Sequence, residues 1–217
     1  MKKRKKITKI YRKILRYEIN VRNKKRLLNS DFTIISSNCV GGVLYHELGL
    51  RFQSPTINMF MNTKDFIKFC KNISFYTSKE LRLKDKEAYT YPVVGIDDIT
   101  LHCVHYKDFD DVQSHWNERV KRINYDNIFL IMSERDGCTY QDLLEFDNLP
   151  FKNKVVFVHE EKPEVKSAYY IPNTELNGID GHWIKGLTEY KGKFTGKRYI
   201  DDFDYVGFFN KKYQIEE

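Results

Sequence analysis

Residues 36–42 combine small polar side chains with two glycines, a composition that could bind an anion. An apolar segment at 32–35 precedes them, and residues 43–49 have the pattern of a short helix. In α/β proteins, a turn between a strand and a helix N-terminus presents backbone N–H groups to phosphates. We therefore predict that a phosphate or sugar phosphate is bound by Ser36, Ser37, Asn38, Gly41 and Gly42.

The same turn contains Cys39, a candidate catalytic nucleophile. A thiol needs a neighbouring base to become a thiolate at neutral pH. His46 follows about two helical turns later and should point elsewhere, whereas His102 or His105, both distant in sequence, could reach Cys39 in space. The alternatives are a buried, inert Cys39 and a tight turn whose glycines serve geometry alone. The turn also lacks the spacing of both standard nucleotide-binding fingerprints.

A second candidate site follows the apolar run at 128–132. It holds two carboxylates and one guanidinium, those of Glu134, Arg135 and Asp136. Asp136 could act as a general base, and Arg135 could bind a phosphate or carboxylate through two parallel N–H groups. The alternative is a helix-entry turn with a solvated ion pair.

Histidines elsewhere offer a further acid or base. His102 and His105 are three residues apart on a predicted strand, so they face opposite ways and cannot share a metal ion without a bulge. We keep His105 as the candidate acid or base, with a structural histidine as the alternative. The pair His182-Trp183 could stack on a sugar ring, although an isolated aromatic pair is weak evidence.

No metal site is predicted. Asp97-Asp98 fits a β-turn better than a divalent-cation site. The four cysteines form no Cys-x-x-Cys pair, so a zinc cluster is not expected. We expect reduced thiols in a cytoplasmic protein.

The positive charge is concentrated in residues 1–29. This segment has 13 Lys/Arg and one acid, a charge of +12, whereas the remaining residues have 24 bases and 29 acids, a charge of −5. An enzyme acting on nucleic acids usually spreads its basic residues over the binding face, so we expect no nucleic-acid partner. No run of 18 apolar residues occurs, and we expect neither a membrane span nor a signal peptide.

The basic segment also has the apolar spacing of an amphipathic helix. Its apolar residues recur at helical intervals: Ile7, Ile10, Tyr11, Ile14 and Leu15. Such a helix can lie on an anionic membrane surface, which we take as a predicted partner of residues 1–29. The alternatives are a helix packed on its own domain with a solvated basic face, and an RNA-binding arm.

The remaining chain alternates strand and helix patterns. Strands are predicted at 32–35, 56–61, 91–97, 99–106, 127–133, 154–159 and 167–171. Helices are predicted at 43–49, from Thr63, at 109–123, from a cap at Thr139 to 146, and at 201–212. This order predicts an α/β fold with a mixed, mostly parallel sheet flanked by helices in Rossmann-like layers. The boundaries are a leader helix at 1–29 and a single α/β domain at 30–217.

Several stretches together resemble one bacterial family. They are residues 35–42 (ISSNCVGG), 45–56 (YHELGLRFQSPT), 65–69 (DFIKF), 102–106 (HCVHY), 116–124 (WNERVKRIN) and 136–138 (DGC). The chain resembles, from about 31 to 172, the family labelled domain of unknown function 1919, often named exopolysaccharide biosynthesis protein. The resemblance implies an α/β fold and a role in surface polysaccharide assembly. It carries over no catalytic residues, and it does not include the lysine-rich leader.

These observations favour a transferase of capsular or exopolysaccharide biosynthesis at the inner face of the cytoplasmic membrane. We expect a glycosyltransferase that takes a nucleotide sugar and transfers to a lipid-linked or soluble glycan. The 36–42 turn and Arg135 would hold the diphosphate, and Asp136 or a histidine would act as base. The alternatives are an acyl- or other group-transferase with Cys39 or a serine as nucleophile, and a non-catalytic subunit of the assembly machinery.

Overall fold

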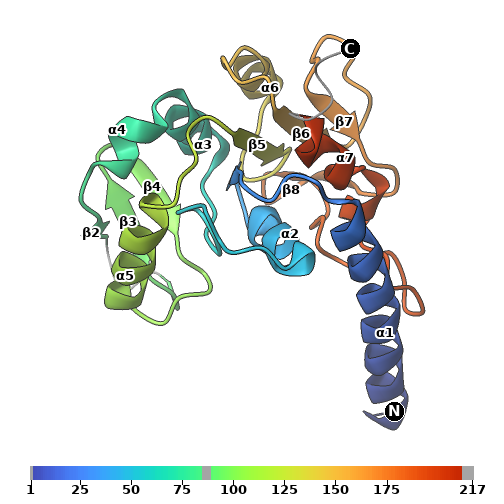
Figure 1. Cartoon of the computed structure of the whole chain (residues 1–217). Helices are drawn as coiled ribbons and strands as arrows, with labels where there is room; N and C mark the ends of the chain where they lie inside the picture. The colour runs from blue at the N-terminus through green and yellow to red at the C-terminus, as the bar shows by residue number, and fades with distance from the viewer. Residues whose placement is uncertain (1, 85–88, 212–217) are drawn as a thin grey trace.

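A four-stranded parallel sheet forms the centre of the computed structural model, which describes residues 2–84 and 89–211. The strands are β1 (Thr33–Ser36), β5 (Ile128–Ser133), β6 (Lys154–Val158) and β7 (Ala168–Tyr170), in the order β1-β5-β6-β7 (Figure 1). Every neighbouring pair is parallel. The carboxyl ends of these strands therefore meet at one edge of the sheet, and the predicted α/β class is confirmed.

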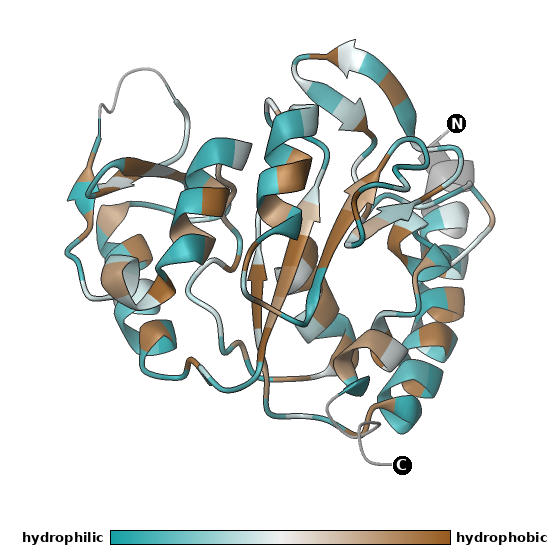
Figure 2. Ribbon diagram, turned by 90° about the horizontal axis from the view of Figure 1, so that it is seen from above, coloured by the Kyte–Doolittle hydropathy of each residue, from teal (hydrophilic) through white to brown (hydrophobic). Residues whose placement is uncertain are grey.

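Helices cover both faces of this sheet, which is why its central strand β5 is fully buried and almost wholly apolar. Leu130 and Met132 pack into one core with α3 (Thr63–Lys71), α5 (Phe109–Val120) and α6 (Tyr140–Asp147). Phe129 and Ile131 alternate with them and pack into a second core with α2 (Val40–Leu48) and α7 (Tyr205–Phe209). Figure 2 shows these strands as hydrophobic segments enclosed by helices of mixed hydropathy.

The chain between β1 and β5 builds a lobe to one side of the sheet (Figure 1). It contains α3, α4 (Ile73–Thr77), α5 and an antiparallel sheet in the order β2-β3-β4. The strands of that sheet are β2 (Arg82–Leu83), β3 (Val93–Ile96) and β4 (Ile99–His102). The predicted strand pair around Asp97 is thus confirmed, whereas α4 and β2 were not predicted.

Two predicted elements are wrong. Residues 56–61 are an irregular segment with one isolated bridge, from Phe60 to His102, because Asn58 adopts a left-handed conformation (φ 62°) that interrupts an extended strand. The last helix is divided into a 3-10 helix, η1 (Tyr199–Asp202), and α7. Asp204 separates them and caps α7 by accepting a hydrogen bond from the Gly207 N–H. The predicted end of that helix, at 212, lies outside the described residues.

Asn62 rather than Thr63 caps α3, since its side chain accepts a hydrogen bond from the Asp65 N–H. The predicted cap at Thr139 is confirmed, with a full capping box to Asp142. A hairpin not predicted from sequence, β8 (Glu175–Ile179) and β9 (His182–Ile184), follows the parallel sheet.

The leader forms one long helix, α1 (Lys2–Arg26), as predicted. Its later turns contact the rest of the chain through polar side chains. Arg16 is buried and pairs with Glu47 of α2 and Asp201 of η1. Asn23 donates a hydrogen bond to the Tyr205 hydroxyl at 2.6 Å. Among the described residues, no helix is both long and apolar enough to span a bilayer.

Candidate functional site

A cavity of about 310 Å³ opens where β1 and β5 end. These two strands are neighbours in register, with Ser36 opposite Ile131. The segments that follow them, which are the two candidate sites of the sequence, therefore meet at this cavity. Its lining residues are Asn38, Cys39, Val40, Phe60, Arg135, Asp136, His182, Gly186, Leu187 and Thr188.

The first segment is held by hydrogen bonds that link the two strand ends. The Ser37 N–H donates to the Ile131 carbonyl at 3.0 Å, which extends the ladder beyond β1. The Asn38 side chain accepts from the Val40 N–H at 3.1 Å and donates to the Ser133 hydroxyl at 3.2 Å. Asn38 thus lines the cavity, while its amide joins the end of β1 to the end of β5.

Gly41 and Gly42 lie inside the first turn of α2, not in a loop before it as predicted. A Cβ atom on Gly41 would lie 2.9 Å from Cβ of Ser36, and one on Gly42 would lie 3.2 Å from Oδ1 of Asn58. Both glycines therefore let α2 pack closely on β1 and on the 57–58 segment. Ser36 is buried beneath α2 and is absent from the cavity lining, and buried Ser37 contributes its backbone to the ladder.

Asp136 supplies the carboxylate of the cavity, from the turn between β5 and α6. It adopts a left-handed backbone conformation (φ 56°), followed by Gly137 at φ 81°. Burial raises the pKa of Asp136 above its ordinary value, and the charges of His182 and Arg135 offset this only in part. A carboxylate with a raised pKa, in a cavity beside cationic groups, is well suited to proton transfer.

Arg135 offers a positive charge beside this carboxylate. Its guanidinium donates to the Ile184 carbonyl, and among residues 2–84 and 89–211 it makes no ion pair. The Thr63 hydroxyl donates to the Arg135 carbonyl at 2.8 Å, which fixes the backbone here. The charge of Arg135 is therefore available to an anion in the cavity.

Cys39 is half-buried at the N-cap position of α2. Burial raises the pKa of its thiol, and the negative charge of Asp136 raises the pKa further. The cavity thus favours a protonated thiol over the thiolate that a nucleophile requires.

Neither His102 nor His105 is placed to act as an acid or base in this cavity, and His105 lies outside the strand on which it was predicted. His105 is exposed in the turn after β4 and does not line the cavity. His102 stacks on Phe60, with ring centroids 4.4 Å apart, and burial lowers the pKa of its imidazole. Since Phe60 lines the cavity, His102 supports the wall from behind.

His182, which entered the sequence analysis only as a stacking candidate, is the histidine of the cavity. The β8–β9 hairpin carries it there, because the Gly137 N–H donates to the Gly181 carbonyl at 3.1 Å and the Trp183 N–H to the Glu134 carbonyl at 3.0 Å. The Asp180-Gly181 dipeptide is a typical hairpin-turn signal that could have predicted this element.

A carboxylate–histidine pair that was not predicted lies beside the cavity lining, at the ends of β5 and β6. Glu134 is 4% exposed and accepts hydrogen bonds from His159 at Nδ1 (2.6 Å) and at the backbone N–H (3.1 Å). The His159 ring stacks on Trp183 at 5.3 Å. The pair fixes the turn that carries Arg135 and Asp136, since it holds the residue immediately before them.

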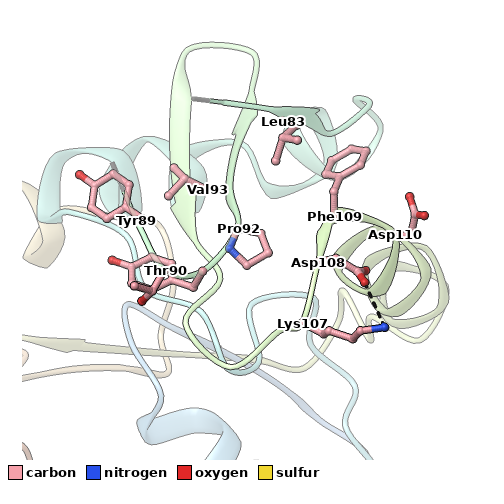
Figure 3. Close-up of a pocket in the computed structure, with 10 residues that line it drawn as sticks. Leu83, Tyr89, Thr90, Pro92, Val93, Lys107, Asp108, Phe109 and Asp110 are labelled. Atoms are coloured by element: carbon pink, nitrogen blue, oxygen red, sulfur yellow. Dashed lines mark ion pairs between the residues drawn. The ribbon is translucent and has the colours of Figure 1, made fainter. Parts of the chain in front are cut away.

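A second cavity, of about 530 Å³, lies in the antiparallel lobe (Figure 3). Tyr89, Pro92 and Phe109 line it together with an ion pair between Lys107 and Asp108. Asp108 already caps α5 by accepting from the Asp111 N–H. That hydrogen bond lowers the pKa of Asp108, which suits a helix cap better than a general base. The lobe cavity also lies away from the parallel strand ends, so we take the smaller cavity as the candidate site.

Together these features define an α/β protein with a cavity at the carboxyl edge of a parallel sheet, whose partly apolar lining holds a carboxylate, a guanidinium, an imidazole and a thiol. Among the described residues, no three His, Cys, Asp or Glu side chains are grouped to hold a metal ion.

The chain belongs to the family described as Domain of unknown function (DUF1919), which matches residues 10–210. This span is longer than the 31–172 of the quoted motifs and takes in part of α1. A protein of Haemophilus influenzae named "Uncharacterized protein" is 40% identical over 195 residues, covering 90% of this chain and 92% of the relative.

Proposed function

We propose that the protein is a transferase whose reaction takes place in the cavity between Asp136, Arg135 and His182. The observation that supports this most is Asp136, a half-buried carboxylate with a raised pKa beside two cationic or protonatable groups at parallel strand ends. This is the arrangement expected for a general base that activates an acceptor hydroxyl.

The donor that best fits the cavity is a nucleotide sugar. Arg135 supplies positive charge for a diphosphate leaving group, and the N-terminal end of α2 lies at the cavity through Cys39 and Val40. The volume of about 310 Å³ is at the lower end of the range for small-molecule sites, so we expect it to take the sugar and phosphates. The acceptor would be a lipid-linked or soluble glycan.

The polysaccharide setting rests on the resemblance seen in the sequence, since neither the family description nor the relative's name states an activity. Covalent transfer through Cys39 is the second candidate. The raised pKa of its thiol speaks against it, because the thiolate would be scarce at neutral pH. A non-catalytic subunit is the third candidate.

A donor-hydrolysis and transfer assay over a panel of nucleotide sugars tests the proposal. Asp136→Asn should lower turnover by about 10²- to 10⁴-fold, Arg135→Gln should weaken donor binding, and Cys39→Ala should leave turnover within a few fold. Asp97→Asn is the matched control, because Asp97 has a similar left-handed backbone (φ 52°) but is exposed in the β3–β4 turn. Full activity of Asp136→Asn would remove Asp136 as the base, and loss of activity in Cys39→Ala would favour the covalent route.

A further inference from the structure

The two faces of α1 have the reverse of the usual polarity. The face toward the body has polar side chains at its centre, with Arg16 and Asn23 only 5% and 6% exposed and Leu15 and Ile19 half-buried beside them. The outward face is apolar, with Ile10, Ile14 and Tyr17 exposed to 51%, 54% and 70%. A surface helix normally places its apolar residues inward, so this face needs an explanation other than packing on its own chain.

The outward apolar residues form one continuous stripe. Positions 10, 14 and 17 are separated by four and three residues, and the half-buried Val21 follows four residues later, a spacing that aligns side chains on one helix face. Arg12 lies toward the body, with its guanidinium 4.9 Å from the Tyr190 ring. The N-terminal part of α1 extends beyond the body in Figure 1. The exposure of Ile10, Ile14 and Tyr17 shows that the stripe faces outward.

Basic side chains flank the stripe. Lys13, Lys24 and Lys25 are exposed on the same helix, and Glu18 is the only acid in residues 1–29. A binding partner must therefore offer a dense negative charge next to an apolar layer. A second copy of this chain would bring another strongly basic helix and would be repelled, and a nucleic acid offers the charge without the apolar layer.

We propose that the outward face of α1 docks the protein on a membrane surface that contains anionic lipids. The helix lies in the plane of the interface, with its stripe among the upper acyl chains and its lysines at the lipid phosphates. The inward ion pairs of Arg16 to Glu47 and Asp201 hold the helix on the body in this orientation.

This docking would also orient the cavity. Gly186, Leu187 and Thr188 line the cavity, and the segment that follows them contacts α1 at Tyr190 and Gly196. One short segment thus lies between the docking helix and the candidate site. The docking proposal itself does not depend on the proposed reaction, because it is tested by binding without turnover.

Vesicle flotation of the full-length protein tests the proposal. We expect it to bind vesicles of phosphatidylcholine that contain about 30% anionic phosphatidylglycerol. It should not bind vesicles of phosphatidylcholine alone. The double variant Ile10→Ser/Ile14→Ser should bind at least about tenfold more weakly. The double variant Lys13→Gln/Lys25→Gln should also bind vesicles more weakly, by about fivefold per charge removed. Added salt should weaken the binding of the wild-type protein.

Ile179→Ser is the matched control, since Ile179 is 62% exposed and belongs to β8, not to α1. It should bind as the wild type does, and thermal unfolding should show that all variants are folded. The proposal is overturned if the wild type does not bind anionic vesicles, if it binds neutral vesicles equally well, or if the Ile10/Ile14 variant binds undiminished. Concentration-dependent dimerisation that this variant abolishes, without vesicle binding, would assign the face to a second copy instead.

Discussion

Nδ1 of His182 accepts a hydrogen bond from the Asp136 backbone N–H at 3.2 Å, while the Asp136 carboxylate lies 3.7 Å from the same nitrogen. In the neutral imidazole this places the proton on Nε2. Protonation of Nδ1 would replace the accepted hydrogen bond with an ion pair to the carboxylate. The two residues, 46 positions apart, therefore meet at one nitrogen, which the backbone N–H and the carboxylate of Asp136 both approach.

The pH dependence of turnover should report the Asp136 carboxylate. A general base must be deprotonated, and burial raises the pKa of Asp136 above its ordinary value of 3.8. We expect kcat/KM to rise with pH through a midpoint above 3.8. Asp136→Asn should abolish this limb, whereas a limb that persists in the variant would assign it to another group.

The same substitution should make the fold more stable at neutral pH. A raised carboxyl pKa means that the folded state binds the proton more tightly than the unfolded state. This contribution to stability is fully present below pH 3.8 and is lost as pH rises through the folded pKa. Urea unfolding at pH 7 should therefore give a higher free energy of unfolding for Asp136→Asn than for the wild type. This difference should shrink as the pH falls toward 3.8. Asn suits the left-handed backbone at this position, so strain should not mask the effect. A destabilised Asp136→Asn at pH 7, with Asp97→Asn unchanged, would contradict this prediction.

Arg16 should be a principal attachment of α1. Burial alone would lower the pKa of its guanidinium, but hydrogen bonds and charges from Glu47 and Asp201 raise it. Arg16→Met leaves Asp201 without a cation, whereas Glu47 keeps its ion pair with Arg198. We therefore expect a loss in the free energy of unfolding below the full cost of a broken buried pair, which is about 3–5 kcal/mol. Chemical denaturation should show this loss, and Lys13→Met, at an exposed position of the same helix, should show little change. Equal stability of the two variants would mean that the ion pairs contribute little.

Gly41 should be required for packing. Its replacement by Ala places a Cβ 2.9 Å from Ser36 and 3.1 Å from Cγ2 of Ile34, so α2 must shift away from β1. Overpacking of this kind costs about 1–3 kcal/mol, offset by the higher helix propensity of Ala, up to about 1 kcal/mol. Thermal unfolding should show a net loss for Gly41→Ala. Gly192→Ala, whose nearest neighbour would be 3.6 Å away, serves as the control; a stabilised Gly41→Ala would rule out the close contact.

The Glu134–His159 pair should stabilise the turn that presents Asp136. Glu134→Ala leaves two donors of His159 without their acceptor, which costs about 1–3 kcal/mol. The comparison is Glu160→Ala, an exposed carboxylate beside the same histidine, for which we expect little change. If both variants have the same free energy of unfolding, the buried hydrogen bonds of Glu134 do not stabilise this turn.

The elements that the sequence determined are those with strong local signals. The buried strands at β1, β5 and β6 follow from continuous apolar runs, and α6 follows from the cap at Thr139. Both candidate turns could be predicted because each follows such a run. Their meeting at one cavity required the parallel pairing of β1 with β5, a contact across about ninety residues.

Only the tertiary structure decided which reactive groups lie close together and how their surroundings shift their pKa values. His182 reaches Asp136 through hairpin contacts that no local pattern encodes, and His105, which the sequence favoured, is exposed elsewhere. Burial raises the pKa values of Asp136 and Cys39, and burial is a property of the packed chain. Likewise, the sequence showed that α1 is basic and amphipathic, but the body's carboxylates determined which face turns inward. Residue types and short-range spacing are written in the sequence, whereas proximity, desolvation and the direction of a helix face arise from long-range packing.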